Sequence, residues 1–291
     1  MKTKIFTLIF VLMASTSALF AESGTCGDNL TWNFADGVLT ISGTGEMTNY
    51  TFNYDVNVPW NTFLSSITTV NISEGVTSIG DYAFTFCYNI TSVTIPSSVT
   101  RIGKYAFDDC TGLTTVYISD LSAWCNMEFY GFPANPTRYA EHLYLNGSEI
   151  TDLVIPNDVT IINAYAFWNC SGLVSVTFPN SVTSIGYGAF NGCSGLTSIT
   201  NYASVPQIID NAVFNYVNKN ICILYVPKGS VNLYKTASVW SEFFNIVGVD
   251  APEGIENTTI GTTQSTKTIR ANQVLIQSGE KIYTLQGQEI K

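Results

Sequence analysis

The sequence predicts a solenoid in which coils of 23 residues, each a β-strand followed by a short helical or 3-10 return, stack on one another. First, the stretch that begins at Val76 recurs at Val99, and the stretch at Val159 recurs at Val182, 23 residues apart in each pair. Second, the recurrent positions form a phenylalanine column and a cysteine column, which contain Phe84, Phe107, Phe167 and Phe190, and Cys87, Cys110, Cys170 and Cys193. Third, one such unit is too short to bury its own apolar face, so it is stable only when neighbours stack on it.

The composition favours an extracellular binding protein. Hydrophobic residues make up 46% of the 291 residues and charged residues only 12%, well below the roughly 25% of a typical globular chain. The surface must therefore consist largely of neutral polar side chains. The formal net charge is −10, and the 12 Lys and Arg residues are scattered. We expect no nucleic acid as a partner, and attraction to anionic membranes is disfavoured, because both need clustered basic residues.

The chain begins with a segment typical of a secretory signal peptide, residues 1–21. Lys2 and Lys4 precede an apolar run from Ile5 to Met13, and small residues lead to Ala21, after which we expect cleavage. An N-terminal membrane anchor is the alternative. Because no other stretch reaches the roughly 18 apolar residues of a spanning helix, we expect no transmembrane segment after signal removal. The protein would then be secreted or lie on the outer cell surface.

The central part of the chain, residues 67–249, is the predicted solenoid, and one coil shows why. Val93 and Ile95 alternate with polar residues as in a half-buried strand, and Pro96 ends the strand because proline cannot donate to a ladder. The stretch from Ala106 to Cys110 fits one turn of helix or 3-10 helix, which leads to the next strand.

The two ends are predicted to cap and extend this solenoid. Residues 22–66 form an N-terminal β cap, in which two strands flank an Asp36-Gly37 turn and protect the edge of the first coil. Residues 250–270 are polar and Thr-rich, which indicates a linker. Residues 271–291 form a tail with two short strands around Ser278-Gly279, a possible secretion or anchoring signal.

The repeat departs from its register in two places. An insert at about residues 119–151 carries an Asn146-Gly147 turn between strand-like stretches. Its aromatic side chains either extend the core or form an exposed contact patch, and comprise Trp124, Phe129, Tyr130, Phe132 and Tyr139. The final coil, from Val205, has Tyr216 or Val217 where the cysteine is expected, and terminal repeats are often atypical in this way.

The coils resemble the leucine-rich repeat in its bacterial BspA-like subtype. The pattern L-x-x-L-x-L-P-x-x-L-x-x-I-x-x-x-A-F-x-x-C is matched by Ile90, Val93, Ile95, Pro96, Val99, Ile102, Ala106, Phe107 and Cys110, and again from Leu173 to Cys193. The resemblance implies a leucine-rich repeat fold and a secreted or surface protein of the Bacteroidetes type, which adheres to host matrix proteins or other cells. The tail resembles part of the C-terminal ends of secreted Bacteroidetes proteins, including type IX secretion cargo.

Seven cysteines in a secreted chain raise the question of disulfides. The four in the repeat column are expected to be buried free thiols that pack like small hydrophobic residues, with ladder disulfides as the alternative. Cys26, Cys125 and Cys222 lie outside that column and are better candidates for a bridge. No metal and no cofactor are expected, because the chain has one histidine and no zinc-type cysteine spacing.

We assign no catalytic residues. His142 could act as a general base, but no nucleophile accompanies it, and a surface turn residue is the simpler interpretation. Glu128, Glu141 and Glu149 could supply a glycosidase carboxylate pair, but nothing in the sequence determines their separation.

What remains as a candidate binding site is the strand face, which we expect to be concave. The residue between the two inward apolar residues of each strand points outward, and this column contains Asn71, Thr94, Tyr117, Val154, Thr177 and Thr200. Such hydroxyl and amide groups can bind protein or glycan, and a merely solvated sheet face is the alternative. We expect a recognition protein for host matrix protein or other cell-surface macromolecules. A glycan-binding accessory protein is the alternative, and an enzyme seated in the insert comes third.

Overall fold

The computed structural model describes residues 21–52 and 57–250, and the backbone of four strands between residues 266 and 290. The expected signal peptide lies outside the described residues, apart from Ala21. No helix in the described part of the chain is long and apolar enough to cross a membrane.

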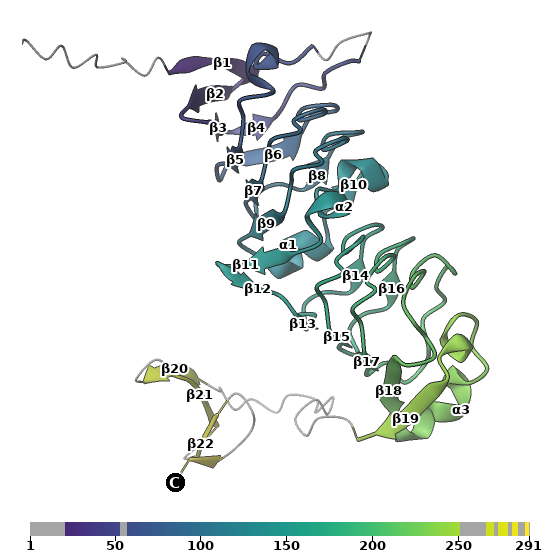
Figure 1. The fold of residues 1–291 in the computed structure, drawn as a ribbon. Helices are drawn as coiled ribbons and strands as arrows, with labels where there is room; N and C mark the ends of the chain where they lie inside the picture. The colour runs from purple at the N-terminus through teal and green to yellow at the C-terminus, as the bar shows by residue number, and fades with distance from the viewer. Residues whose placement is uncertain are drawn as a thin grey trace, which may run out of the picture.

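The described chain is a stack of coils whose main strands line one side (Figure 1). The first sheet has eight strands, in the order β1 (Glu22–Gly27), β2 (Leu30–Ala35), β3 (Val38–Gly43), β5 (Thr69–Ile72), β7 (Ser92–Ile95), β9 (Thr115–Ile118), β11 (Leu143–Leu145) and β12 (Ser148–Glu149). Strands β3 to β11 pair in parallel. Strands β1 and β2 add antiparallel at one edge, with the Asp36-Gly37 turn between β2 and β3, and β12 adds antiparallel at the other edge. The first sheet therefore ends at β12 instead of continuing through the whole solenoid.

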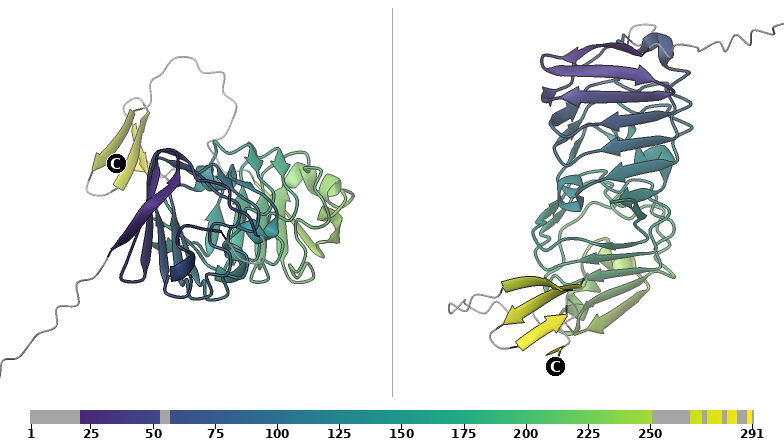
Figure 2. Two further views of the ribbon diagram at one scale, coloured as in Figure 1. Left: turned by 90° about the horizontal axis from the view of Figure 1, so that it is seen from above. Right: turned by 90° about the vertical axis from the view of Figure 1, so that its left-hand side faces the viewer.

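A second parallel sheet continues the stack on the same side. Its five strands are β13 (Asp152–Val154), β15 (Ser175–Phe178), β17 (Ser198–Asn201), β18 (Ile223–Pro227) and β19 (Asn245–Val249). The right panel of Figure 2 looks onto this strand side. The opposite side carries two sheets of short strands, β4 (Gly45–Glu46), β6 (Val76–Ile79), β8 (Arg101–Ile102) and β10 (Glu128–Phe129), and β14 (Ile161–Ile162) with β16 (Ser184–Ile185).

The return segments differ from the helical turn that the sequence predicts. They are successive tight turns, because residues of each coil adopt a left-handed backbone, for example Tyr82 and Phe86 with φ of 56° and 64°. This conformation is uncommon for residues other than glycine. The turns direct backbone N–H groups to the next coil, since Tyr82 N donates to Lys104 O (2.8 Å) and Phe84 N to Ala106 O (2.8 Å). Bonds between coils thus alternate with bonds within the turns, such as Cys87 N to Phe84 O (3.1 Å).

The phenylalanine and cysteine columns fill the interior, and all eight side chains are buried. Neighbouring rings contact one another, with centroids 5.2 Å apart for Phe84 and Phe107 and 5.1 Å apart for Phe167 and Phe190. The thiol of Cys110 donates to Phe84 O (3.1 Å). Each coil therefore buries its apolar face against the next one, which is the stabilising contact of a stacked repeat.

The insert is a coil of the stack and not an added module. Strand β11 pairs in parallel with β9, and β10 pairs in parallel with β8. Within this coil, α1 (Leu121–Cys125) precedes β10, and the 3-10 helix η2 (Phe132–Ala134) and α2 (Thr137–Ala140) lie between β10 and β11. Buried polar groups join this coil to the next one, because Asn135 Nδ2 donates to Tyr165 O (2.6 Å) and Thr137 Oγ1 to Trp168 O (2.7 Å).

The last described coils close the stack with aromatic side chains. They contain the 3-10 helices η3 (Lys228–Ser230) and η4 (Trp240–Glu242) and the helix α3 (Val231–Tyr234), while η1 (Asn61–Phe63) lies near the start. Trp240 and Tyr234 are buried. Val217 takes the cysteine position, since its N–H bonds to Phe214 O as Cys193 N bonds to Phe190 O. Tyr216 beside it points outward and is 81% exposed.

The tail contains more strands than the sequence predicts. Strands β21 (Gln273–Ser278) and β22 (Lys281–Thr284) pair antiparallel. They are flanked by β20 (Thr266–Arg270) and β23 (Glu289–Ile290), so the 250–270 segment is not a linker throughout. An isolated hairpin is marginal in water, and added strands pair its open edges. Residues 251–265 lie outside the described part.

Candidate recognition surface

The strand face presents neutral polar side chains in continuous rows. In the first sheet Asn71 pairs with Thr94, and Thr94 with Tyr117. In the second sheet Val154 pairs with Thr177, and Thr177 with Thr200. All six are partly or well exposed. The strands bring together each half of the predicted column, because parallel pairing in register repeats the same outward position from coil to coil.

The column is not continuous between the two halves, which corrects the sequence prediction. The outward neighbour of Tyr117 is Tyr144 of the insert, whose ring centroid lies 5.3 Å away. Val154 instead begins the second sheet at β13. The second row also extends past Thr200 to Tyr225 and Val247. Sequence reasoning missed Tyr144 because the insert breaks the 23-residue spacing.

A polar cluster lies where the first sheet ends. His142 Nδ1 is 2.6 Å from Glu149 Oε1, and Tyr144 Oη donates to Glu149 Oε2 (3.5 Å). Glu141 accepts from Ser171 Oγ (2.9 Å). Glu128 belongs to β10, on the other side of the coil. Glu128 is thus apart from the other two glutamates, whereas Glu141 and Glu149 both lie near Ser171 and Gly172, and each has a hydrogen-bond partner.

The aromatic residues of the insert divide between interior and surface. Trp124 and Phe129 are buried, so for these two residues the core extension holds and the contact patch does not. Trp124 Nε1 donates to Ala166 O (2.8 Å), and its ring meets Phe129 edge-on at 5.3 Å. Tyr130 is 48% exposed, and Tyr139 is half-buried with its hydroxyl against Asp109.

A second aromatic surface, which sequence reasoning missed, follows the return turns. Tyr82 and Tyr105 stack with centroids 5.3 Å apart, and Tyr165 contacts Tyr187 at 5.7 Å. We call this the return ridge; it consists of Phe52, Tyr82, Tyr105, Phe132, Tyr165, Trp168 and Tyr187. The sequence does contain a signal for this surface, because three coils have a tyrosine immediately before the Ala-Phe pair.

The seven thiols are all free and buried. Cys26, Cys125 and Cys222, which were the better bridge candidates, are not bridged either. Burial raises the pKa of Cys125, Cys170 and Cys222 to about 12. Neutral thiols are poor nucleophiles and poor metal ligands, so these side chains serve packing. Within the described residues no group of three or more His, Cys, Asp or Glu could hold a metal ion.

Two hollows of the surface are lined by none of the residues of the predicted strand-face column. One of about 550 Å³ lies between the coil of Val182 and the loop 202–208. Another of about 350 Å³ lies between β10 and Asn163, where the two short-strand sheets meet. Neither includes His142 or Glu149, so the only histidine lies outside both hollows.

The comparisons with known proteins agree with this architecture. A family model described as BspA type leucine rich repeat region matches residues 44–136 and 137–271 in six copies. No curated protein matches the chain.

Solved structures that resemble the chain are bacterial repeat proteins. A leucine-rich repeat protein from Eubacterium ventriosum is 19% identical, with 79% of this chain and 85% of that chain covered and a TM-score of 0.32. The T. pallidum leucine rich repeat protein is 20% identical, with 80% and 97% covered and a TM-score of 0.34. A leucine rich cell surface protein from Faecalibacterium prausnitzii is 18% identical, with 80% and 95% covered and a TM-score of 0.26. These TM-scores are below 0.5, so the family assignment rests on the match to the repeat model.

Proposed function

Because the chain belongs to the BspA-type leucine-rich repeat family, we propose that it is a bacterial recognition protein, secreted or held on the outer cell surface, that binds a macromolecule through its strand face. The partner class we favour is a host matrix protein or another cell-surface macromolecule, as the family resemblance implies. The Bacteroidetes origin and the signal peptide are parts of the same proposal.

One observation supports this function best, namely the outward row of Asn71, Thr94, Tyr117 and Tyr144. These side chains are neutral and lie on a rigid parallel ladder. The two tyrosines contact each other and end the row beside Glu149. Tyrosine supplies a large amphipathic contact area at low entropic cost, and small polar residues around it adapt to a partner's hydrogen bonds. A surface of this kind suits protein recognition.

The test uses the full mature chain immobilised for surface plasmon resonance. Fibronectin, fibrinogen, laminin and collagen are passed over wild type, over the double variant Tyr117→Ala/Tyr144→Ala, and over Tyr105→Ala as a matched control on the return ridge. We expect at least one matrix protein to bind, with a loss of tenfold or more in the double variant only. Binding to none of the four, or equal binding by the double variant, would contradict the proposal.

Export is tested separately in the organism that makes the protein. We expect the chain in the outer-surface or culture-medium fraction, with a mature N-terminus near Glu22. An intact Met1 terminus in the cytoplasmic fraction would rule out the secreted assignment without bearing on the strand face.

A further inference from the structure

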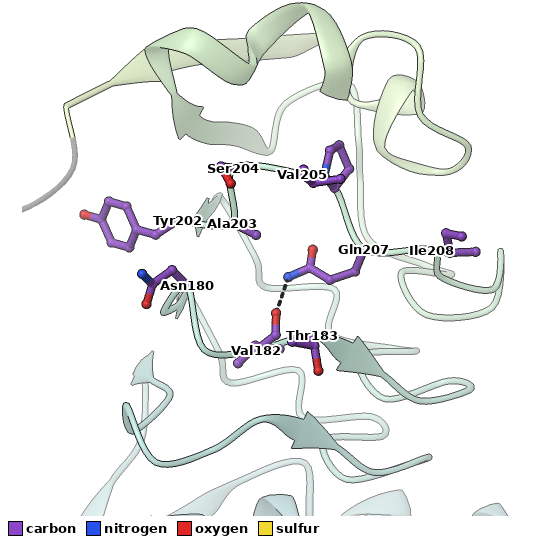
Figure 3. A pocket seen from close by; sticks show the side chains of 10 residues that line it. Asn180, Val182, Thr183, Tyr202, Ala203, Ser204, Val205, Gln207 and Ile208 are labelled. Carbon is purple, nitrogen blue, oxygen red and sulfur yellow. Dashed lines mark hydrogen bonds between the residues drawn. The ribbon is translucent and has the colours of Figure 1, made fainter. Parts of the chain in front are cut away.

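The hollow beside Val182 exists because the coil that follows β16 adds no strand to the short-strand sheet β14–β16. Phe167 N bonds to Ala189 O, and the equivalent bond of Phe190 N runs to Val213 O, so this coil carries one residue more than the 23-residue period. The short-strand sheet β14–β16 stops at β16, and the segment that would follow, 202–208, forms a loop instead. A void of about 550 Å³ remains between that loop and the coil of Val182 (Figure 3).

Buried hydrogen bonds hold the loop in this position. Gln207 Nε2 donates to Val182 O (2.8 Å), Gln207 Oε1 accepts from Asn201 Nδ2 (2.8 Å), and Trp240 Nε1 donates to Gln207 O (2.9 Å). Ala203 O accepts from the buried hydroxyl of Tyr234 (2.9 Å). Asn201 pairs in register with the buried Phe178 of the preceding strand, so a polar side chain takes a position that is apolar there. A buried polar network that is fully paired makes the loop rigid, and a rigid site loses little entropy on binding.

The lining has the chemistry of a site for a neutral, hydroxyl-rich ligand. None of the ten lining residues is charged. Asn180 and Tyr202 lie together at one end of the hollow in Figure 3, and Ile208 lies at the other. The side chain of Ile208 is wholly exposed, and Val205 is 70% exposed. Amide and hydroxyl groups beside exposed aliphatic carbon match a sugar ring, which has hydroxyl edges and an apolar C–H face.

We propose that this hollow binds a neutral saccharide. Its volume lies in the range of small-molecule sites, about 300–1,000 Å³, and accommodates a short oligosaccharide. A phosphate or an acidic sugar is disfavoured because no Lys or Arg lines the hollow. The site shares no residue with the row from Asn71 to Tyr144, so it adds a second binding activity and does not depend on the proposed protein recognition.

Saturation-transfer NMR on the full mature chain tests this proposal. The probes are maltotetraose, cellotetraose, mannotetraose and galactotetraose, with sialyllactose as an anionic comparison. Variants Asn180→Ala and Tyr202→Ala alter the hollow without removing the buried network, and Tyr216→Ala is the matched control, exposed outside it. We expect transfer to at least one neutral tetrasaccharide and a weakening of tenfold or more in both hollow variants.

Absence of transfer to all four neutral probes would overturn the proposal, and so would equal transfer by wild type and both hollow variants. Stronger binding of sialyllactose than of any neutral probe would also overturn it. An extended peptide that protects the Ile185 amide, which points to the open edge of β16, from hydrogen exchange with no saccharide bound would show that the hollow serves strand addition instead. The strand-face variant Tyr117→Ala/Tyr144→Ala should bind the saccharide as wild type does, which separates this test from that of the proposed function.

Discussion

Tyr117 and Tyr144 lie side by side on neighbouring parallel strands, with ring centroids 5.3 Å apart, although a whole irregular coil separates them in the chain. This pair joins the regular coils to the insert on the strand face. Because the pair sits where the first sheet ends, it combines exposure with a rigid backbone, and we expect it to matter more for binding than for folding.

Replacement of Tyr144 by alanine should cost little stability. The side chain is half-buried and packs on Tyr117, so we expect a loss of about 1 kcal/mol in the free energy of unfolding. The adjacent Leu143 points into the core and is buried, so Leu143→Ala should cost about 2–5 kcal/mol. Denaturant unfolding measures both, and equal losses would show that strand β11 does not alternate as described.

Phe167→Ala should open a cavity in the phenylalanine column. The ring is buried and stacks on Phe190 at 5.1 Å, so we expect a loss of about 3–5 kcal/mol in the free energy of unfolding and a clearly lower Tm. Tyr187→Ala, on the exposed return ridge of the next coil, is the control and should lower the Tm much less. An unchanged Tm for Phe167→Ala would mean that the ring is not in the core.

Trp124→Phe tests whether the insert belongs to the stack. The substitution keeps an aromatic ring but removes the Nε1 donor to Ala166 O, a buried bond between the two halves of the solenoid. We expect a loss of about 1–3 kcal/mol. Trp168→Phe, on the return ridge, should cost less. If calorimetry gives the two variants the same Tm as wild type, Trp124 is not the buried link described.

The buried thiols predict how stability depends on pH. Burial raises the pKa of all seven, to about 12 for Cys26 and Cys125. In the unfolded chain a thiol ionises near its ordinary value of 9.0, so above that pH unfolding releases protons and the free energy of unfolding falls. We expect the Tm to be lower at about pH 10 than at about pH 7.5, and less so in Cys222→Ala.

A thiol titration provides an independent check of the same side chains. The native protein should leave the thiols unreactive toward Ellman's reagent at neutral pH, and denaturation without reductant should expose all seven. Fewer than seven after denaturation would mean that a disulfide had formed.

Much of the fold was predictable from the sequence, because each coil provides the next with the same environment. The Phe and Cys columns recur at one spacing and are buried where that spacing places them. The hairpin at Asp36-Gly37 and the turn at Asn146-Gly147 were predictable from local turn chemistry. The two left-handed positions in the return turns were not, because Tyr82 and Phe86 carry no signal for them.

The candidate sites were predictable only within the regular coils. Asn71, Thr94, Thr177 and Thr200 follow from strand alternation, which is a local property of the chain. The contact of Tyr117 with Tyr144, the burial of Trp124 and the hollow at Gln207 arise where the spacing breaks. In these irregular coils, backbone pairing and side-chain packing between coils determine which residues become neighbours. The repeated sequence thus determined the coil and its interior, and tertiary packing decided what the irregular coils place on the surface.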